Sequence, residues 1–360
     1  MKRLILEQSN DEFYTSHSGL ALVGACINRY SDLGRHVSKV AKGSDHIAEI
    51  DIIRSYLGLL CLGKSDYQAI AAMQEDDYFK QSLGIGRIPS VERLRQRLDE
   101  AGSGLIPVIN RSSRTMLKRL KASITGYQNG LVPLDVDVFP QDNSNTKKEG
   151  VSRTYKNYDG YAPIAAYLGT EGWCLEMELR PGSQHVQNGF VDFIKRVIPG
   201  ARELVKQPIL VRLDAGNDAL ETLVALEDAE RAHYIVKWNP RQSDINAWRD
   251  KVFTEGTVKT PRVGKRVGTV IIEEQRKFAE ATYTLKRIVR MTERTIDRKG
   301  QFLLAPDITL EGWWTDLALL SEEVIELYRQ HATSEQFHSE SRPISISNGC
   351  RVASSPPMPW

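Results

Sequence analysis

Apolar runs bounded by turn residues occupy the middle of the chain, and their lengths predict an order of strands and helices. Three strand-like runs separated by glycines and charged turns come first, at residues 132–139, 161–169 and 174–180. A helical spacing of apolar residues then appears at 189–197, followed by a strand at 209–213, a helix at 218–230 and a strand at 233–236. This order predicts a mixed α/β (α+β) domain whose sheet begins as an antiparallel meander.

Helical patterns precede this block and strand patterns follow it. Ser44–Leu62 carries apolar residues on one face. Ser90 is placed to cap a helix that Gly102 ends, and a further helix is expected over Pro107–Lys121. Beyond the block, apolar and polar residues alternate at 267–272, 282–289 and 301–304, which predicts a β-rich insertion.

Three carboxylates lie where a metal-dependent nuclease would need them. Asp137 and Asp214 end strand-like runs, and Glu335 lies in a helix-compatible segment. Such carboxylates repel one another by roughly 4 kcal/mol per pair at 4 Å and an effective dielectric near 20, so a cation must hold them. Oxygen ligands suit Mg²⁺ or Mn²⁺, and two such ions about 3.5–4 Å apart support phosphoryl transfer. The alternatives are chance placement among 46 acidic residues and a glycoside hydrolase with paired carboxylates.

Five stretches make a family resemblance specific. They are LDVD at 134–137, KEGVSRTY at 148–155, GYAP at 160–163, LRPGS at 179–183 and RLDAG at 212–216. Over nearly its whole length the chain resembles a bacterial insertion-sequence transposase of the DDE class, close to the thirteen-eighty group. The resemblance implies a ribonuclease-H-like core with a β-rich insertion and a Tyr, Arg, Glu, Lys signature. Tyr328 and Glu335 fit that signature, whereas His331 replaces its arginine and Arg342 holds its lysine position.

The resemblance also implies roles for single residues. Asp137, Asp214 and Glu335 would be the catalytic carboxylates and would hold two Mg²⁺ or Mn²⁺ ions, with Asp135 a rival for the first position. Tyr328 and His331 would contact DNA near the cut. An aromatic residue of the insertion can stack on a base flipped out of the transposon end, and the candidates are Trp248, Trp313 and Trp314. Ordinary core packing is the alternative for each tryptophan.

The function implied is that of a DNA transposase. It would bind the inverted repeats of its insertion sequence, cut at their ends and join the freed 3′ hydroxyls to target DNA, as a homodimer in the DNA complex. The alternative from another class is a catalytically inert DNA-binding relic that interferes with an intact relative.

Positive charge is concentrated in the helices that precede the core. Nine Lys or Arg and three acidic residues lie between 87 and 121, a local net charge of +6 against +2 for the whole chain. Helical cations bind phosphates without reading sequence, so we expect DNA contacts here, with a solvated helix face as the alternative. The candidates are Arg93, Arg97, Arg111, Arg114, Lys118 and Lys121.

These patterns divide the chain into five expected parts. They are a helical DNA-binding region at 1–125, the first part of the catalytic core at 126–236, the insertion at 237–305, the end of the core at 306–340 and an irregular tail at 341–360. The tail is rich in serine and proline. If the gene uses suitable synonymous codons for the tail, reading them with one extra base at the front gives a helical, basic sequence like that of the family. We therefore hypothesise a frameshift that truncates the chain.

Composition excludes several other classes. No apolar run approaches the roughly 18 residues of a membrane span, and the start of the chain is not a signal peptide. The four cysteines lie far apart and the histidines show no zinc spacing. No glycine-rich phosphate loop is present, so a nucleotide cofactor is not expected. A cytoplasmic, nucleoid-associated protein is the expectation.

Overall fold

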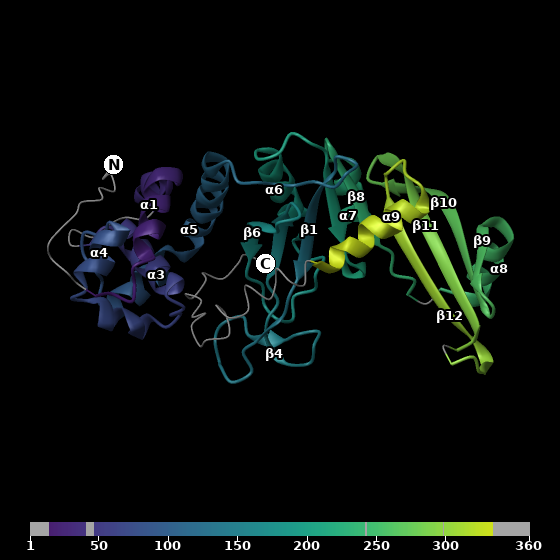
Figure 1. Cartoon of the computed structure of the whole chain (residues 1–360), viewed down its shortest axis with the longest axis horizontal. Helices are drawn as coiled ribbons and strands as arrows, with labels where there is room; N and C mark the ends of the chain where they lie inside the picture. The colour runs from purple at the N-terminus through teal and green to yellow at the C-terminus, as the bar shows by residue number, and fades with distance from the viewer. Residues whose placement is uncertain (1–13, 41–46, 242, 298, 334–360) are drawn as a thin grey trace.

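Three parts follow one another along the molecule. The computed structural model describes residues 14–40, 47–241, 243–297 and 299–333. Helices form the amino-terminal part, a mixed sheet forms the middle, and long strands extend beyond it (Figure 1). Glu335, Arg342 and the tail at 341–360 lie outside the described residues, so what the sequence predicts for them stays a prediction.

The amino-terminal helices pack around an apolar core of their own. They are α1 (Leu20–Tyr30), α2 (Leu33–Val40), α3 (Glu49–Cys61), the 3₁₀ helix η1 (Tyr67–Met73), α4 (Asp77–Leu83) and α5 (Val91–Leu120). Ile52, Leu59 and Phe79 are fully buried in this core. Because a Cβ on Gly24 would overlap the carbonyl oxygen of Ser82, only glycine lets α1 approach α4 so closely.

Helix α5 is one continuous helix where the sequence predicts two. Ser90 does cap it, with its hydroxyl oxygen accepting a hydrogen bond from the backbone N–H of Arg93 at 3.3 Å. The predicted end at Gly102 and the second helix from Pro107 are wrong, because one helix of 30 residues runs through both. Glycine and proline weaken a helix, but tertiary packing supplies most helical stability. Leu94, Leu105, Val108 and Leu117 are buried along α5 and hold it together.

The central sheet has the order that the apolar runs predict. Its strands are β1 (Val132–Val138), β5 (Ile164–Leu168), β6 (Trp173–Glu178), β7 (Ile209–Leu213) and β8 (Ala232–Lys237), with helices α6 (Phe190–Arg202) and α7 (Leu220–Glu227) between the later ones. Strand β1 pairs antiparallel with β5 and parallel with β7, and β7 pairs parallel with β8. A small sheet of β2 (Gln141–Asp142), β3 (Ser152–Arg153) and β4 (Asp159–Tyr161) lies between β1 and β5 in sequence. The mixed α/β class is thereby confirmed.

The β-rich insertion extends this same sheet. It contains α8 (Ile245–Glu255), β9 (Thr257–Arg262), β10 (Lys265–Phe278), β11 (Ala281–Ile296) and β12 (Phe302–Thr315). The end of β12 pairs with β8, which gives one sheet in the order β6-β5-β1-β7-β8-β12-β11-β10-β9. The alternating segments at 267–272 and 282–289 are confirmed as parts of β10 and β11, and residues 302–304 of the third begin β12, which continues past residue 305. Helix α9 (Ser321–Arg329) and the 3₁₀ helix η3 (Gln330–Thr333) follow.

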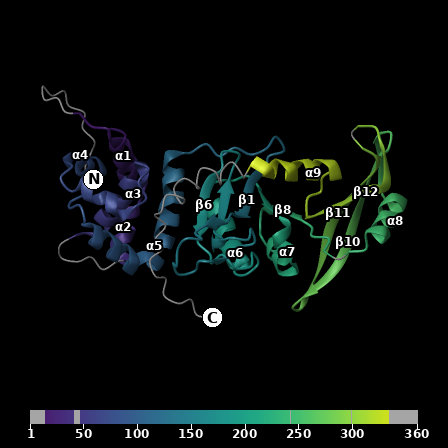
Figure 2. The same ribbon diagram turned by 90° about the horizontal axis from the view of Figure 1, so that it is seen from below.

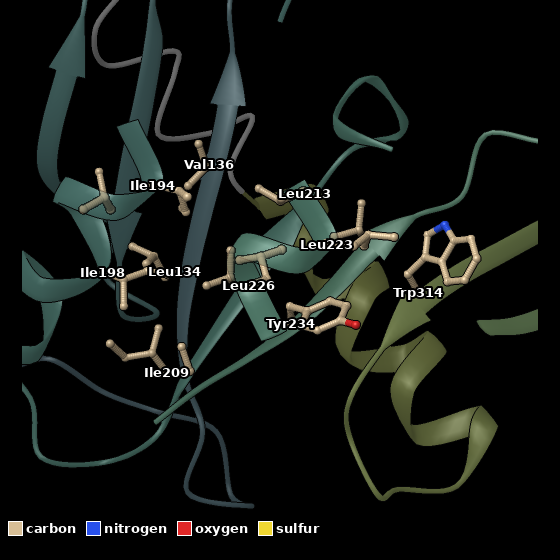
Figure 3. Close-up of a cluster of buried hydrophobic side chains, with 14 of the residues drawn as sticks. Leu134, Val136, Ile194, Ile198, Ile209, Leu213, Leu223, Leu226, Tyr234 and Trp314 are labelled. Carbon is tan, nitrogen blue, oxygen red and sulfur yellow. The ribbon is translucent and has the colours of Figure 1, made fainter. Parts of the chain in front are cut away.

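Alternation along the strands separates two faces of the sheet. Leu134, Val136 and Leu213 point to the face covered by α6 and α7 (Figure 3). Leu210 and Trp313 point to the opposite face, where they pack with α9, which runs beside β1 and β8 (Figure 2). Burial of each large aliphatic side chain contributes about 1.5–3 kcal/mol, so both layers stabilise the sheet. In the described part of the chain, no helix has the length and hydropathy to cross a membrane.

Candidate active site

Two of the predicted carboxylates lie at one register of neighbouring parallel strands. Asp135 in β1 is opposite Arg212 in β7, and continuing that pairing by two residues places Asp137 opposite Asp214. Side chains two residues apart share a face of a sheet, so Asp137 and Asp214 both point to the α9 face. The carboxyl ends of parallel strands meet at one edge, which is why two residues so far apart in sequence come together. The structure therefore brings Asp137 and Asp214 into one site.

The rival aspartate has a different partner. Asp135 receives two hydrogen bonds of 2.7 Å from Arg212, one from Nε and one from an Nη nitrogen. Both side chains are almost completely buried. A bidentate guanidinium–carboxylate pair of this kind satisfies the charges of both groups. Asp135 is thus held in a structural ion pair, and the partly exposed Asp137 is the better placed of the two to hold a metal.

Arg212 also fixes the end of α9 over the carboxylates. Its second Nη nitrogen donates to the carbonyl oxygen of Leu327 at 2.7 Å. The next residue, Tyr328, stacks on His331 with ring centroids 5.8 Å apart and planes inclined by 9°. His331 Nε2 is buried without a hydrogen-bond partner in the described structure and lies 3.9 Å from Asp135 Oδ1. Tyr328 and His331, which occupy two positions of the expected signature, are therefore near the aspartates.

Burial and neighbouring carboxylates raise the pKa of two acidic groups in the site. Burial, and then repulsion by Asp137, raise the pKa of Asp214, although hydrogen bonds from Asn217 and the Gly216 N–H oppose this. Burial, followed by the charges of Asp214 and Asp137, raises the pKa of Tyr328. Tyr328 thus stays protonated at neutral pH and keeps a hydroxyl donor beside the carboxylates. A cation bound between the aspartates would relieve the repulsion.

The donor set fits a hard divalent ion. Asp137 and Asp214 offer oxygen atoms only, which Mg²⁺ and Mn²⁺ prefer. Asn217, which donates to Asp214 Oδ1 at 2.8 Å, has a buried side-chain oxygen with no hydrogen-bond partner in the described structure. Within the described ranges no group of three or more His, Cys, Asp or Glu is close enough to hold a metal. Asp137 and Asp214 are thus placed where they could hold such an ion, and the third predicted ligand, Glu335, lies outside those ranges.

Sequence reasoning missed a cation in the site. The β7–β8 pairing, continued by one residue, places Lys237 opposite Asp214 and on the same face. Lys237 Nζ lies 4.1 Å from the ring centroid of Trp313 and 2.6 Å from Glu311 Oε1. Its position after the apolar run of β8 is the same strand-end signal that singled out the aspartates. Asp137, Asp214 and Lys237 thus form a row across three parallel strands.

The predicted DNA-binding arginines and lysines in and directly after α5 fall into two groups, those with internal partners and those that are exposed. Arg97 is 12% exposed and pairs with Glu49 and Glu100. Arg114 lies 3.8 Å from carboxylate oxygens of Glu176 and Glu203, where it connects α5 to the core. These two arginines have internal partners, which the sequence could not reveal because most of the partners lie in other elements. Arg93, Arg111, Lys118 and Lys121 are exposed.

The three candidate tryptophans have different surroundings. Trp313 is 1% exposed and packs beside Tyr328 and Lys237. Trp314 and Trp248 line a cavity of about 540 Å³ on the other face of the sheet, together with Trp238 and Arg287. Asp218, shortly after Asp214 in sequence, also lines the cavity, and its Oδ1 atom accepts a hydrogen bond of 2.9 Å from Trp314 Nε1.

Arg287 gives that cavity an unsatisfied donor. Its guanidinium carbon lies 4.3 Å from the ring centroid of Trp238, 5.2 Å from that of Trp248 and 4.5 Å from that of Trp314. The side chain is 8% exposed, yet its Nε atom has no hydrogen-bond partner in the described structure. Aromatic faces with an unpaired guanidinium donor suit a planar ligand that accepts hydrogen bonds.

Comparison with known proteins identifies the family. A piggyBac transposase synaptic complex with hairpin DNA, solved by cryo-electron microscopy, has a TM-score of 0.36 at 10% identity, with 90% of this chain and 68% of that chain covered. No curated protein matches the sequence. The family model described as transposase DDE domain group 1 matches residues 5–344, nearly the whole chain. The chain therefore belongs to the DDE transposase domain family, group 1.

Proposed function

We propose that this protein is a DNA transposase of the thirteen-eighty-like group that binds the inverted repeats of an insertion sequence. It cuts the strands at the repeat ends and joins the 3′ hydroxyls to target DNA. The observation that carries the proposal is the common register of Asp137 and Asp214 on the face that α9 covers. Family membership supports it, because both aspartates lie within the matched residues.

In this proposal Asp137, Asp214 and Glu335 hold two Mg²⁺ or Mn²⁺ ions. When bound, such ions activate the attacking hydroxyl and stabilise the leaving oxygen of phosphoryl transfer. Hydrogen bonds from the Gly216 N–H and Asn217 to Oδ1 fix the carboxylate of Asp214. The buried Asp135–Arg212 pair keeps β1, β7 and α9 in their relative places, and so acts by positioning.

Polar groups at the end of α9 would contact the phosphate near the cut. Tyr328 supplies a hydroxyl donor that stays protonated, and Lys237 of β8, which is paired with Glu311, lies 5.7 Å from the Tyr328 ring and would add a cation. His331 stands where the family signature has arginine, and a histidine cannot donate two parallel hydrogen bonds to one phosphate. We expect phosphate to be held less firmly here than by a chain with arginine at that position.

The DNA would lie along both basic parts of the molecule. The exposed cations of α5 form one part, within the proposed DNA-binding region at 1–125. The second is the insertion, where residues 257–299 contain twelve Lys or Arg against five acidic residues, a net charge of +7. We further propose that the core at 126–236 and 306–340 carries the chemistry, and that two copies act together on paired ends.

The tryptophan-lined cavity would take an unpaired base from the transposon end. Its aromatic walls suit stacking, and Arg287 Nε can donate to a base acceptor. Trp248→Ala opens one wall and should weaken binding of nicked or distorted ends more than binding of intact duplex. Equal reductions in affinity for both DNAs would remove this assignment and leave the tryptophans as packing residues.

Cleavage of end-containing DNA tests the proposed function. The purified chain is incubated with labelled duplex carrying the transposon ends, with Mg²⁺, with Mn²⁺ or with chelator, and the product ends are mapped. Metal-dependent cuts at the repeat ends are expected. Binding without any cut would favour the inert relic, a candidate that His331 at the signature arginine position supports. Cuts that ignore the repeats would contradict both.

A further inference from the structure

A pocket of about 430 Å³ opens within the amino-terminal helical unit, far along the chain from the carboxylates. Its walls come from α1, α2, α3, α5 and the turn after α4. Three arginines from three different helices line it, namely Arg35, Arg54 and Arg119. No role in the proposed chemistry uses any of them. A pocket with three converging guanidinium groups is suited to an anion.

Arg54 forms the inner wall and is held in place without a carboxylate. Its Nη1 atom donates to the carbonyl oxygens of Leu83 at 3.1 Å and Gly84 at 2.9 Å, and Nη2 donates to the Asn28 side chain at 2.5 Å. Asp51 is the carboxylate whose charge acts on Arg54, but it accepts its own hydrogen bonds from the N–H groups of Gly86 and Arg87 and forms no ion pair with Arg54 in the described structure. The buried Nε atom of Arg54 has no hydrogen-bond partner there. Burial lowers the pKa of Arg54, because its positive charge is partly removed from water. An anion in the pocket would offset that desolvation.

Arg35 and Arg119 stand at the mouth. Both side chains are exposed, and Arg119 is oriented by donating from Nη1 to the carbonyl oxygen of Ser31 at 3.0 Å. Neither forms an ion pair with a carboxylate of the described structure. Arg119 belongs to the last turn of α5, about two turns after the exposed Arg111, whose Nε lies 4.0 Å from Asp32 of the pocket wall. The mouth therefore continues the basic surface of that helix.

Asp32 also lines the pocket, and its carboxylate already has hydrogen-bond and ion-pair partners. Asp32 accepts a hydrogen bond from the Ser112 hydroxyl at 2.9 Å and pairs with His36 at 3.2 Å, and Arg111 Nε lies 4.0 Å away. These neighbours hold the pKa of Asp32 below its usual value despite the opposing effect of burial. Asp32 thus has three partners of its own and forms no ion pair with Arg35, Arg54 or Arg119 in the described structure.

We propose that this pocket binds one backbone phosphate of duplex DNA and so fixes the register of the helical unit on the transposon end. The proposal rests on DNA as the partner, which belongs to the proposed function. A phosphate of the backbone is favoured over a small free anion because the mouth is continuous with the exposed cations of α5. Backbone contacts position a protein on DNA without reading its sequence.

Neutral phosphate substitution tests the pocket directly. Transposon-end duplexes are prepared with a single methylphosphonate at each backbone position in turn, and their affinities for the full chain are measured. For the wild type, we expect one position to stand out, with affinity reduced roughly tenfold, as for one charged hydrogen-bonded contact. The Arg35→Ala and Arg119→Ala variants should bind unmodified DNA more weakly and show little further reduction at that position. Lys64→Ala, an exposed cation outside the pocket, should behave like the wild type.

The outcomes separate this proposal from the proposed function. If every methylphosphonate costs each variant as much as the wild type, the arginines act only as diffuse charge and the pocket assignment is wrong. Metal-dependent cleavage with no position-specific coupling would leave the transposase assignment intact and overturn only the pocket. Coupling without cleavage would support the pocket in a chain that does not cut. Absence of DNA binding by the wild type would overturn both.

Discussion

Arg212 separates the roles of two aspartates that share one face of β1. It forms two hydrogen bonds with Asp135. Asp137, two residues nearer the strand end, is left beside Asp214. The sequence presents both as LDVD, and only the β1–β7 register distinguishes them. A fully buried charge without its partner is costly, whereas one of two repelling carboxylates can be neutralised with little harm. The two positions should therefore respond in opposite ways to the same substitution.

The matched pair Asp135→Asn and Asp137→Asn measures this difference. Asp135→Asn should lower the free energy of unfolding by about 3–5 kcal/mol, because Arg212 stays buried and charged. Asp137→Asn should leave metal-free stability unchanged or slightly higher, and should abolish cleavage. Urea denaturation followed by circular dichroism gives both values. Comparable destabilisation by the two variants would assign Asp137 a structural role as well.

The raised pKa of Asp214 predicts a pH dependence of stability. Burial and Asp137 make the folded chain hold this proton more tightly than the unfolded chain, so the contribution is present at low pH and is lost as pH rises through the raised pKa. Asp214→Asn removes the titration. Without metal, its stability relative to the wild type should grow by on the order of 1 kcal/mol between about pH 4 and about pH 7.

Mg²⁺ should reverse the order of these two proteins. A ligand that binds only the folded state stabilises it, so saturating Mg²⁺ should raise the Tm of the wild type and leave that of Asp214→Asn unchanged. Thermal unfolding at several pH values, with Mg²⁺ and with chelator, records both effects. A stability difference that is flat with pH, or a variant that is still stabilised by Mg²⁺, would contradict this arrangement of charges.

At the scale of elements, helix α5 depends on tertiary contacts more than on local sequence. Gly102 and Pro107 locally favour an ending, which is why the sequence predicts two helices where there is one. The buried residues of α5 decide otherwise, and a sequence pattern cannot display packing against distant elements. By contrast, the strands of the core were predictable because each is a short apolar run between turns. The row of Asp137, Asp214 and Lys237 required the pairing register, which periodicity does not contain.

Pro107→Ala tests the interpretation of α5. Proline inside a helix removes a backbone hydrogen bond and crowds the preceding turn, so alanine at this exposed site should raise the free energy of unfolding by about 1–3 kcal/mol. DNA affinity should not change, because the helix keeps its course. Lower stability in chemical denaturation would mean that neighbouring elements require the local geometry imposed by proline.

At the scale of the whole molecule, charge is separated along the chain while the total is near neutral. A net charge of +2 conceals +6 in the helices at 87–121 and +7 in the insertion at 257–299. Only the first of these stands out in the sequence, because the cations of the insertion are dispersed along the strands, singly or in adjacent pairs, and form no long run. Both basic parts flank the core in the long direction of the molecule (Figure 1).

Salt dependence of DNA binding measures how much the helices contribute. Replacing exposed Arg111 and Lys118 by alanine should reduce the slope of log affinity against log salt by about 0.9 for each DNA phosphate that is no longer neutralised. Arg114 is left in place because it joins α5 to Glu176 and Glu203. A matched variant with Lys64→Ala and Lys80→Ala supplies the control. An unchanged slope would mean that α5 presents an ordinary solvated face.

The central claim is that Asp137 and Asp214 form a metal-dependent centre for DNA strand cleavage, and single-turnover cleavage by Asp214→Asn tests it most directly. The wild type and the variant are incubated with labelled transposon ends and Mg²⁺, and both cleavage and end binding are measured. We predict that the variant binds the ends as tightly as the wild type in the absence of metal and cuts them about 100-fold more slowly or worse, because a metal ligand has been removed. Cleavage by Asp214→Asn at the wild-type rate, still dependent on Mg²⁺, would contradict the account.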